Sequence, residues 1–371
     1  MALFDLGPKD RPEALFGRET ELEQLTRLVD AGRWTAILGP RMVGKTSLAK
    51  AVTRRGKRPV VYVNLWGARG TQGLLDAFVH GLNSSQTLSD RLRKAFARVE
   101  GISIGPAGIT LSPRDRPLRT MWDLVNVIGE QSKRSVIILD EVQEVAAISG
   151  ALLKALANVF NTHPEVVFLF TGSYFGILHT LLEPAQDSPL FGRPPASMRL
   201  NPFDVETSVG FLTRGFEEYR IRPTPQSLDW VVRRSLDGIP GWLTLYGNNV
   251  AVSRMSPEVG ERAAVQDGKK VARTELVHFL ERRTAGLYWD ALRALASEVS
   301  WGELRAALSA RRGTRVNDNS VRNVVQTLLY ANLIVETEHR YSISDPMMRA
   351  FVRDNPRPPR GTEPASTRQL P

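Results

Sequence analysis

A glycine-rich segment with the spacing G-x-x-x-x-G-K-[ST] is the feature that most constrains what this chain can fold into. The segment consists of Gly39, Pro40, Arg41, Met42, Val43, Gly44, Lys45 and Thr46. An apolar run at 34–38 precedes it, and a helix-like run begins at Ser47. Glycines tolerate positive φ, so successive backbone N–H groups can point at phosphate oxygens, and the following helix adds the positive end of its dipole. A strand, this loop and a helix in that order predict an α/β unit that binds phosphate.

Two residues of the loop carry chemistry, and a second segment complements them. Lys45 can reach the β- and γ-phosphates as a point charge, and the Thr46 hydroxyl can hold Mg²⁺. The apolar run 136–139 ends in Asp140 and Glu141. Asp140 can hold Mg²⁺ through its water shell, and Glu141 can orient and activate an attacking water. The alternative is a buried strand that happens to end in an acidic helix cap, and the loop upstream favours the hydrolytic interpretation.

Small polar and basic residues follow another apolar run, at 166–170. Thr171 or Ser173 can hydrogen-bond the γ-phosphate or the attacking water, or can cap a helix that begins at 174. Arg193 and Arg199 lie further along the chain. We expect them just beyond the same sheet edge, where a guanidinium can neutralise transition-state charge in cis or in a neighbouring subunit. The other interpretation of Arg193 is that it ties down a proline-rich loop.

Periodicity predicts a doubly wound α/β domain, the P-loop NTPase fold with a parallel sheet, over residues 1–200. We expect strands at 34–38, 59–63, 135–140 and 165–171, because each is apolar and rich in β-branched residues. Helices are expected at 19–30, 70–82, 119–131 and 149–161. Residues 102–111 alternate around a Gly/Pro turn and predict an inserted β-hairpin, which serves either as a contact surface or as a packing flap.

The rest of the chain is expected to be mainly helical. Residues 201–283 predict a helical lid and a long bridging helix, which we place at 259–283. Within 284–354, helices near 287–297, 301–310 and 319–331 precede strands at 333–336 and 339–343, the order of a winged-helix domain. Residues 355–371 are rich in proline and arginine, and we expect them to be disordered.

The charge balance suggests an acidic partner. The net charge is +10 and the pI is near 10.1, which favours DNA, although a solvated basic surface is equally compatible. The helix expected at 319–331 would expose residue types that read base edges, and basic residues before it can contact phosphates. These candidates are Arg322, Asn323 and Gln326 for bases, and Arg311, Arg312 and Arg315 for phosphates.

Other classes are disfavoured. The chain has no cysteine, which excludes disulfides and thiolate zinc sites. Its apolar runs are too short to cross a bilayer, and its first residues do not form a signal peptide, so we expect a cytoplasmic protein without membrane contact.

An ordered set of motifs resembles the archaeal ATPase family, which belongs to the STAND-like P-loop NTPases and is related to AAA+ proteins. The resemblance covers about residues 14–353. Besides the loop, the motifs are Phe16-Gly17-Arg18-Glu19, Ile137-Ile138-Leu139-Asp140-Glu141, Thr171-Gly172-Ser173, Gly192-Arg193, Gly238-Ile239-Pro240-Gly241 and the terminal Tyr341-x-Ile343-x-Asp345-Pro346.

The resemblance implies an Mg²⁺-dependent ATPase that binds ATP and ADP. It implies that Phe16, Gly17 and Arg18 lie near the adenine, and that the phosphate loop extends through Ser47. Asp140 would be the Mg²⁺ ligand, Glu141 the catalytic base, Ser173 a sensor, and Pro240 part of a lid that faces the nucleotide. AAA+ relatives carry a lid arginine that touches the γ-phosphate, and none is adjacent to Pro240. Arg233 or Arg234 is a possible substitute, and slow, switch-like turnover follows from the departure.

Two functions remain open at the level of sequence. The first is an ATP-driven switch whose winged helix binds DNA. The second is a signalling ATPase that self-associates when ATP replaces ADP and uses the winged helix for protein interaction or self-inhibition. Other helper ATPase roles are less favoured.

Overall fold

The computed structural model describes residues 2–359, apart from 55–57, 107, 112–116, 132–133, 173–176 and 282. Residues 360–371 of the expected disordered tail therefore lie outside the described residues. The chain divides into two compact units. The sheet unit comprises Pro8–Gly39 and Gly44–Leu200, and the helical unit comprises Met1–Gly7, Pro40–Val43 and Asn201–Pro371.

The sheet unit is built on five parallel strands in the order β2-β5-β6-β1-β7. They are β1 (Thr35–Leu38), β2 (Val60–Asn64), β5 (Ser135–Asp140), β6 (Val166–Thr171) and β7 (Ala196–Arg199). The first four confirm the expected strands. The edge strand β7 was not predicted, because its sequence Ala-Ser-Met-Arg lacks a β-branched apolar run.

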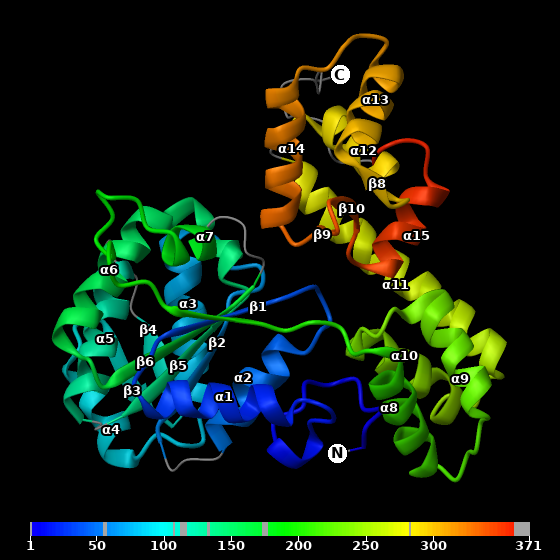
Figure 1. The fold of residues 1–371 in the computed structure, drawn as a ribbon. Coiled ribbons are helices and arrows are strands. Elements are labelled where there is room, and N and C mark those ends of the chain that lie inside the picture. Colours follow the sequence, from blue (N-terminus) through cyan, green and yellow to red (C-terminus); the bar gives the residue numbers. More distant parts are fainter. Residues whose placement is uncertain are drawn as a thin grey trace, which may run out of the picture. The chain divides into compact units, whose positions relative to one another are not determined.

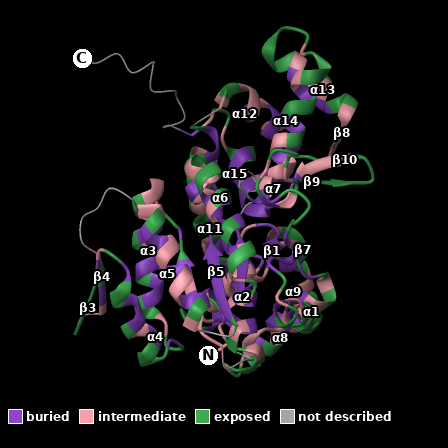
Figure 2. Cartoon of the chain, turned by 90° about the vertical axis from the view of Figure 1, so that its left-hand side faces the viewer, coloured by how far each residue is buried: buried purple, intermediate pink, exposed green. Residues whose placement is uncertain are grey.

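The central strands form the core of this unit. Every residue of β5 and β6 is buried, as near-continuous apolar strands covered on both faces should be. Figure 2 shows the buried strand β5. Trp34, directly before β1, fixes one end of the sheet. Its indole N–H donates to the carbonyl of Val166 at 2.9 Å, and its ring packs edge-on against Phe160 and Phe168.

Helices cover both faces of the sheet (Figure 1). They are α1 (Glu19–Asp30), α2 (Lys45–Arg54), α3 (Gly70–Ser84), α4 (Asp90–Ala95), α5 (Pro117–Gln131), α6 (Ser149–Thr162) and α7 (Ile177–Leu182), with 3₁₀ turns at Pro12–Ala14, Phe96–Arg98 and Val142–Ile148. The expected helices are confirmed, and α4 and α7 are additional. α1 illustrates the cause, because Leu22, Leu25 and Val29 recur at helical spacing and are buried.

The inserted hairpin is confirmed as β3 (Ile102–Gly105) and β4 (Gly108–Leu111). Asn83 of α3 anchors it, since its side-chain amide accepts from the Ile109 N–H at 2.8 Å and donates to the Ile109 carbonyl at 2.9 Å. One side chain thereby satisfies both backbone groups of Ile109, as a neighbouring strand would.

One described segment, Val142–Thr162, is long and apolar enough by composition to cross a membrane. In the structure it is a 3₁₀ turn followed by α6, with non-helical backbone angles at Val145. α6 packs against α5 in the helical layer of the sheet unit, so the fold itself explains the apolar composition of this segment.

The helical unit contains a first group of helices and a terminal module. The first group is α8 (Val205–Glu217), α9 (Pro225–Val231), a π turn (Val232–Leu236), α10 (Pro240–Ala251) and α11 (Pro257–Leu280). The terminal module is α12 (Ala285–Leu295), β8 (Val299–Ser300), α13 (Trp301–Arg312), α14 (Asp318–Tyr330), β9 (Ile334–Thr337), β10 (Arg340–Ile343) and α15 (Pro346–Asp354).

Local signals explain the terminal module. Ser300 and Glu303 form a reciprocal capping box at the start of α13, and Asn317 caps α14 by accepting from the Ser320 N–H at 2.7 Å. The strands form a sheet in the order β8-β10-β9. The expected helices and the hairpin are present, whereas β8 and α15 were not predicted. The winged-helix interpretation of this order remains a prediction.

Candidate nucleotide site

The motif residues of the sheet unit meet where three parallel strands end. β1 leads into the phosphate loop, β5 ends at Asp140 and β6 ends at Thr171. The Thr46 hydroxyl donates to Asp140 Oδ2 at 2.9 Å, and the Thr171 hydroxyl donates to Asp140 Oδ1. The Asp140 side chain is buried, with 4% of its surface exposed. The carboxyl edge of the sheet is the usual place for ligands in this architecture.

The phosphate loop has the backbone expected of an anion cradle. Gly39 and Gly44 adopt φ of 144° and 103°, and α2 begins at Lys45. The Lys45 ammonium donates to the Gly39 carbonyl at 2.9 Å, so the side chain folds back across the loop rather than extending into solvent. An ammonium group and a helix N-terminus thus lie together, and both favour a bound anion.

Thr46 and Asp140 fit Mg²⁺. A hydroxyl and a carboxylate are hard oxygen ligands, and Mg²⁺ typically takes one or two such groups together with phosphates and water. When bound there, Mg²⁺ supplies positive charge that neutralises phosphate oxygens. The hydrogen bond between the two side chains already holds both oxygens at one place.

Glu141 occupies a strained position directly after Asp140. Its backbone lies in the left-handed region, with φ of 58° and ψ of 46°, which is uncommon for a residue other than glycine or asparagine. Gln143 donates from Nε2 to Glu141 Oε2. Gly172 permits this packing, because a Cβ there would lie 2.2 Å from Gln143 Oε1. The neighbouring loop therefore fixes the orientation of this carboxylate.

Two residues that were not predicted complete the cluster. The Tyr62 hydroxyl donates to Asp140 Oδ2 at 2.6 Å, and Lys50 Nζ lies 3.8 Å from the centre of the Tyr62 ring. Burial raises the pKa of Tyr62, aided by the Asp140 charge, so the phenol stays protonated and donates. Burial lowers the pKa of Lys50, although the Asp140 charge opposes that shift. The sequence signal for Tyr62 was a hydroxyl group within the otherwise apolar run of β2 (Val60–Asn64). That signal marks the residue as unusual, but its partner Asp140 follows only from the pairing of β2 with β5.

The residues implied for adenine binding precede α1. Gly17 adopts φ of 61°, and Arg18 is buried and pairs with Glu21 at 2.7 Å between Nη1 and Oε1. Phe16 lies in the same turn. Ser47, at the start of α2, accepts the Lys9 N–H on its hydroxyl at 3.1 Å. The adenine role of Phe16, Gly17 and Arg18 stays a prediction.

Pro40–Val43, the tip of the loop, belongs to the helical unit, as does Pro240. Pro240 begins α10, and the next residue, Gly241, donates its N–H to the Met42 carbonyl at 2.9 Å. A Cβ at Gly241 would lie 2.7 Å from the Met42 side chain, so only glycine allows this approach. Arg41 pairs with Glu275 at 3.7 Å. Pro240 therefore lies beside the loop tip within the helical unit, and its role as a lid element stays a prediction.

Other predicted residues are placed differently. Ser173 lies outside the described residues. Arg193 bonds to the Asn161 amide oxygen and lies over the Phe160 ring, three residues before β7 begins. This is the amino edge of the sheet and not the carboxyl edge where we expected the residue, and the contacts with Asn161 and Phe160 fit the alternative that Arg193 ties down its loop. A catalytic role for Arg193 stays a prediction. Arg199, the last residue of β7, lies at the carboxyl edge of the sheet, opposite Leu38 in the register of β7 with β1.

Comparison with known proteins decides the family. A family model for an ATPase domain found predominantly in Archaea matches residues 15–245, more than half of the chain. The chain belongs to this archaeal ATPase family. A Walker-type ATPase from Pyrococcus abyssi is similar to it, with 28% sequence identity, a TM-score of 0.75 and coverage of 95% of this chain and 99% of that one. No curated protein matches the chain.

A more distant likeness concerns the fold of this chain. The ORC2 protein of Aeropyrum pernix, in its ADPNP–ADP complexes, has 16% identity and a TM-score of 0.61, with 95% of each chain covered. Its ADP form has the same identity and a TM-score of 0.52. These findings confirm the AAA+-related P-loop fold and the family resemblance seen in the sequence.

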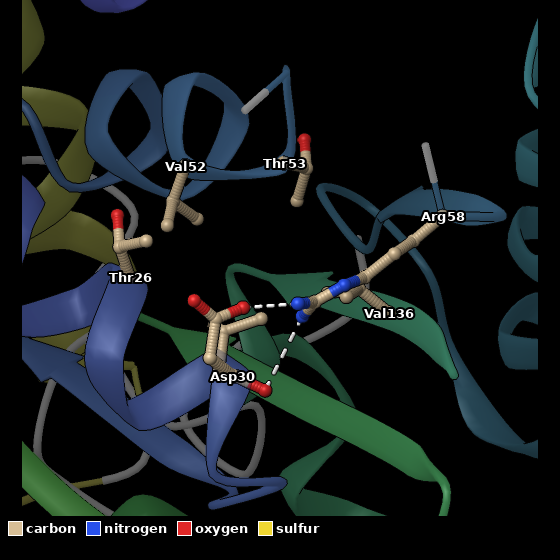
Figure 3. Close-up of a pocket in the computed structure, with 7 residues that line it drawn as sticks. Thr26, Asp30, Val52, Thr53, Arg58 and Val136 are labelled. Carbon is tan, nitrogen blue, oxygen red and sulfur yellow. Dashed lines mark hydrogen bonds and ion pairs between the residues drawn. The ribbon is translucent and has the colours of Figure 1, made fainter. Parts of the chain in front are cut away.

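A cavity of about 230 Å³ lies elsewhere in the ATPase (Figure 3). It is lined by Thr26, Val29, Asp30, Val52, Thr53, Arg58 and Val136. Val136 lies near the amino end of β5, at the sheet edge opposite Asp140. Arg58 is paired with Asp30, and the Thr26 and Thr53 hydroxyls donate to carbonyls of their own helices. The cavity is separate from the nucleotide site because Val136 and Asp140 lie at opposite ends of β5. The polar groups that line the cavity already have partners within the protein.

The candidate nucleic-acid residues lie on α13, α14 and the loop between them. Arg322, Asn323 and Gln326 are exposed, while their neighbours Val321 and Val324 are buried. One face of α14 therefore packs inward and the predicted face reaches solvent. Arg311, Arg312 and Arg315 are also exposed.

Proposed function

We propose that this archaeal ATPase binds ATP with Mg²⁺ and hydrolyses it to ADP and phosphate. The observation that carries the proposal is the pairing of Thr46 with Asp140 at 2.9 Å, with Glu141 next along the chain. The phosphate loop and Lys45 bind and orient the triphosphate. Glu141 orients water and takes its proton as the water oxygen attacks the γ-phosphorus and the bond to the β-phosphate oxygen breaks.

Slow turnover is part of the proposal. Arg233 pairs with Asp229 at 2.9 Å, and Arg234 lies 4.3 Å above the Trp230 ring and pairs with Glu261 at 3.5 Å. Both guanidinium groups are thus held by partners within the helical unit, and neither is poised as a substitute for the lid arginine of AAA+ relatives. Without such a group, less transition-state charge is neutralised.

Two substitutions test the chemistry. Lys45→Ala should abolish nucleotide binding, because it removes the cation at the loop. Glu141→Gln should retain ATP binding while hydrolysis falls by roughly 100-fold or more, because general-base catalysis is lost. Binding is measured with a fluorescent nucleotide and turnover by phosphate release. Wild-type hydrolysis by the Glu141→Gln protein would remove Glu141 from the proposed role.

We further propose that α14 binds DNA and that ATP drives the switch. The supporting observation is an exposed set of basic and amide groups. Among the described residues, Arg311, Arg315 and Arg322 form no salt bridge, whereas Arg305 pairs with Asp318 and Arg312 with Asp290. The hydrogen bond from Arg305 is the main cause that lowers the pKa of Asp318, and the charges of Arg315 and Arg322 act on that carboxyl group only secondarily. An arginine that is not already paired can replace counterions on phosphate or bond to a base edge.

The β9–β10 turn supports a helix-centred contact. The turn consists of Glu338 and His339, with Glu336 near the end of β9, and all three are exposed. Arg340, at the start of β10, is paired with Glu298 and Glu303. Carboxylates at the tip disfavour contact with phosphates. The proposed DNA surface is therefore α14, the end of α13 and the loop between them, not the tip of the hairpin.

DNA binding is tested by titrating a labelled duplex at several salt concentrations. Arg311→Ala and Arg315→Ala should each weaken binding to all sequences and reduce the salt slope by about 1. Arg322→Ala should also relax sequence preference. Arg91→Ala, which changes the net charge equally on the exposed face of α4, is the control. The absence of binding near 50 mM salt, or binding that salt does not weaken, would refute the DNA proposal.

Self-association when ATP replaces ADP is the second candidate function. Arg193 is held by Asn161 and Phe160 of its own chain at the amino edge of the sheet, so a catalytic role for it in this assembly would be in a neighbouring subunit and would require these contacts to open. Light scattering with ADP and with ATP, under conditions that block hydrolysis, tests for assembly. A wild-type protein that stays monomeric in both nucleotides would exclude this function.

A further inference from the structure

Asp140 accepts hydrogen bonds from three hydroxyl groups, and one of them belongs to neither the phosphate loop nor β6. That group is the Tyr62 phenol on β2. We propose that Tyr62 is a positioning residue that fixes the Asp140 carboxylate for Mg²⁺–nucleotide binding. This inference rests on the proposed function, because it assigns a role to Tyr62 within the same site.

The distribution of donors over the carboxylate supports the assignment. Oδ2 accepts from Tyr62 at 2.6 Å and from Thr46 at 2.9 Å, while Oδ1 accepts from Thr171. Each carboxylate oxygen offers about two acceptor positions, so these two donors occupy Oδ2. Rotation of the carboxyl group would break both bonds, and a buried carboxylate has no water to replace them.

Tyr62 is itself held in place from two sides. Its strand is in register with β5, with Tyr62 opposite Ile138 and Asn64 opposite Asp140. The Lys50 ammonium lies 3.8 Å from the ring centre on the face of the phenol. A cation at this distance stabilises the ring position and draws electron density from the phenol, which makes its O–H a stronger donor. The hydroxyl therefore points at Asp140 from a fixed ring.

Tyr62 acts on the metal step and not on the phosphate loop. Of the three donors, Thr46 also serves as a ligand candidate, and its hydroxyl must orient for both roles. Tyr62 has only the carboxylate to hold. Loss of residues that orient metal ligands typically costs 10–100-fold in metal affinity. Without the phenol, Asp140 retains Thr46 and Thr171, so we expect the lower end of that range.

The test compares Tyr62→Phe with the wild-type protein, since this change removes only the hydroxyl and keeps the ring beneath Lys50. A fluorescent ADP is titrated in the presence of Mg²⁺ and in EDTA. Mn²⁺ binding to the protein–ADP complex is followed by electron paramagnetic resonance. Tyr62→Phe should bind ADP in EDTA as tightly as the wild type does. Its increase in ADP affinity on addition of Mg²⁺ should be about tenfold smaller than that of the wild type, and it should bind Mn²⁺ about tenfold more weakly. Tyr341→Phe, a tyrosine of β10, is the matched control.

Four outcomes overturn the proposal. A wild-type gain from Mg²⁺ in Tyr62→Phe shows that the phenol does not position Asp140. Equal weakening in EDTA and in Mg²⁺, or a melting temperature lowered by many degrees without nucleotide, assigns Tyr62 a structural role. If Mg²⁺ does not increase the ADP affinity of the wild-type protein, both the proposed function and this inference are refuted. If Mg²⁺ increases the affinity of the wild type and of Tyr62→Phe equally, only this inference is refuted and the proposed function stands.

Discussion

At the scale of single residues, Glu141 combines a catalytic assignment with an unfavourable backbone. A residue with a Cβ loses about 1–2 kcal/mol in the left-handed conformation, and glycine does not. Its φ of 58° therefore predicts that the backbone conformation of Glu141 lowers the free energy of unfolding. Such strain persists where the surroundings hold the residue for another purpose.

Glu141→Gly should therefore stabilise the protein by up to about 1 kcal/mol while abolishing ATP hydrolysis. Glu141→Gln keeps the Cβ and is the matched control, since it should lose hydrolysis without gaining stability. Thermal unfolding without nucleotide gives the comparison. A Glu141→Gly protein that melts below Glu141→Gln would show that the left-handed backbone is not strained.

The residues of the site differ in how far sequence could reveal them. Thr46 and Asp140 follow from local patterns, because a loop spacing and an apolar run ending in a carboxylate each carry their own chemistry. Tyr62 depends on the register between two strands that lie far apart in the chain, which no local pattern encodes. The position of Arg193 likewise depends on β7, whose sequence lacks the β-branched apolar run that would predict a strand and thereby its sheet edge.

At the scale of elements, α15 begins with a buried cap. Asp345 Oδ1 accepts from the N–H groups of Met347 at 2.8 Å and Met348 at 3.4 Å, and from the Trp242 indole at 3.2 Å. Burial, with a contribution from the Glu275 charge, raises the pKa of Asp345 to about 7 from its usual 3.8. The cap joins α10 to α15 within the helical unit.

This cap makes the stability of the helical unit depend on pH. The folded state binds the Asp345 proton more tightly than the unfolded state does, so stability is greatest below about pH 4 and falls as pH rises to about 7. Asp345→Asn keeps an acceptor oxygen and removes the charge. Its melting temperature should therefore rise relative to the wild type between pH 4.5 and pH 8.

Glu217→Gln, at the exposed end of α8, is the control for that comparison. A constant difference between Asp345→Asn and wild type across this pH range would contradict the prediction. Sequence periodicity did not predict α15, because the helix is only nine residues long and starts almost directly after β10. Proline at the first helical position and aspartate before it were the signals available.

At the scale of the whole molecule, the chain passes between its two units at its amino end as well as after Leu200. Met1–Gly7 belongs to the helical unit, and the sheet unit begins at Pro8. Phe4 anchors this first segment. It is fully buried, packs against Phe216 with ring centres 5.0 Å apart, and lies where a Cβ on Gly215 or Gly247 would come within 2.3 Å of its ring.

Phe4→Ala should destabilise the helical unit by about 3–5 kcal/mol, because it empties a site that two glycines shape. Leu6→Ala, in the same segment but 63% exposed, should change stability by less than about 0.5 kcal/mol. Calorimetry with and without ADP distinguishes the two units if they unfold in separate transitions. Bound ADP raises the midpoint temperature of the transition of the unit that binds it. If Phe4→Ala shifts unfolding no more than Leu6→Ala does, the amino-terminal segment is not part of the helical core.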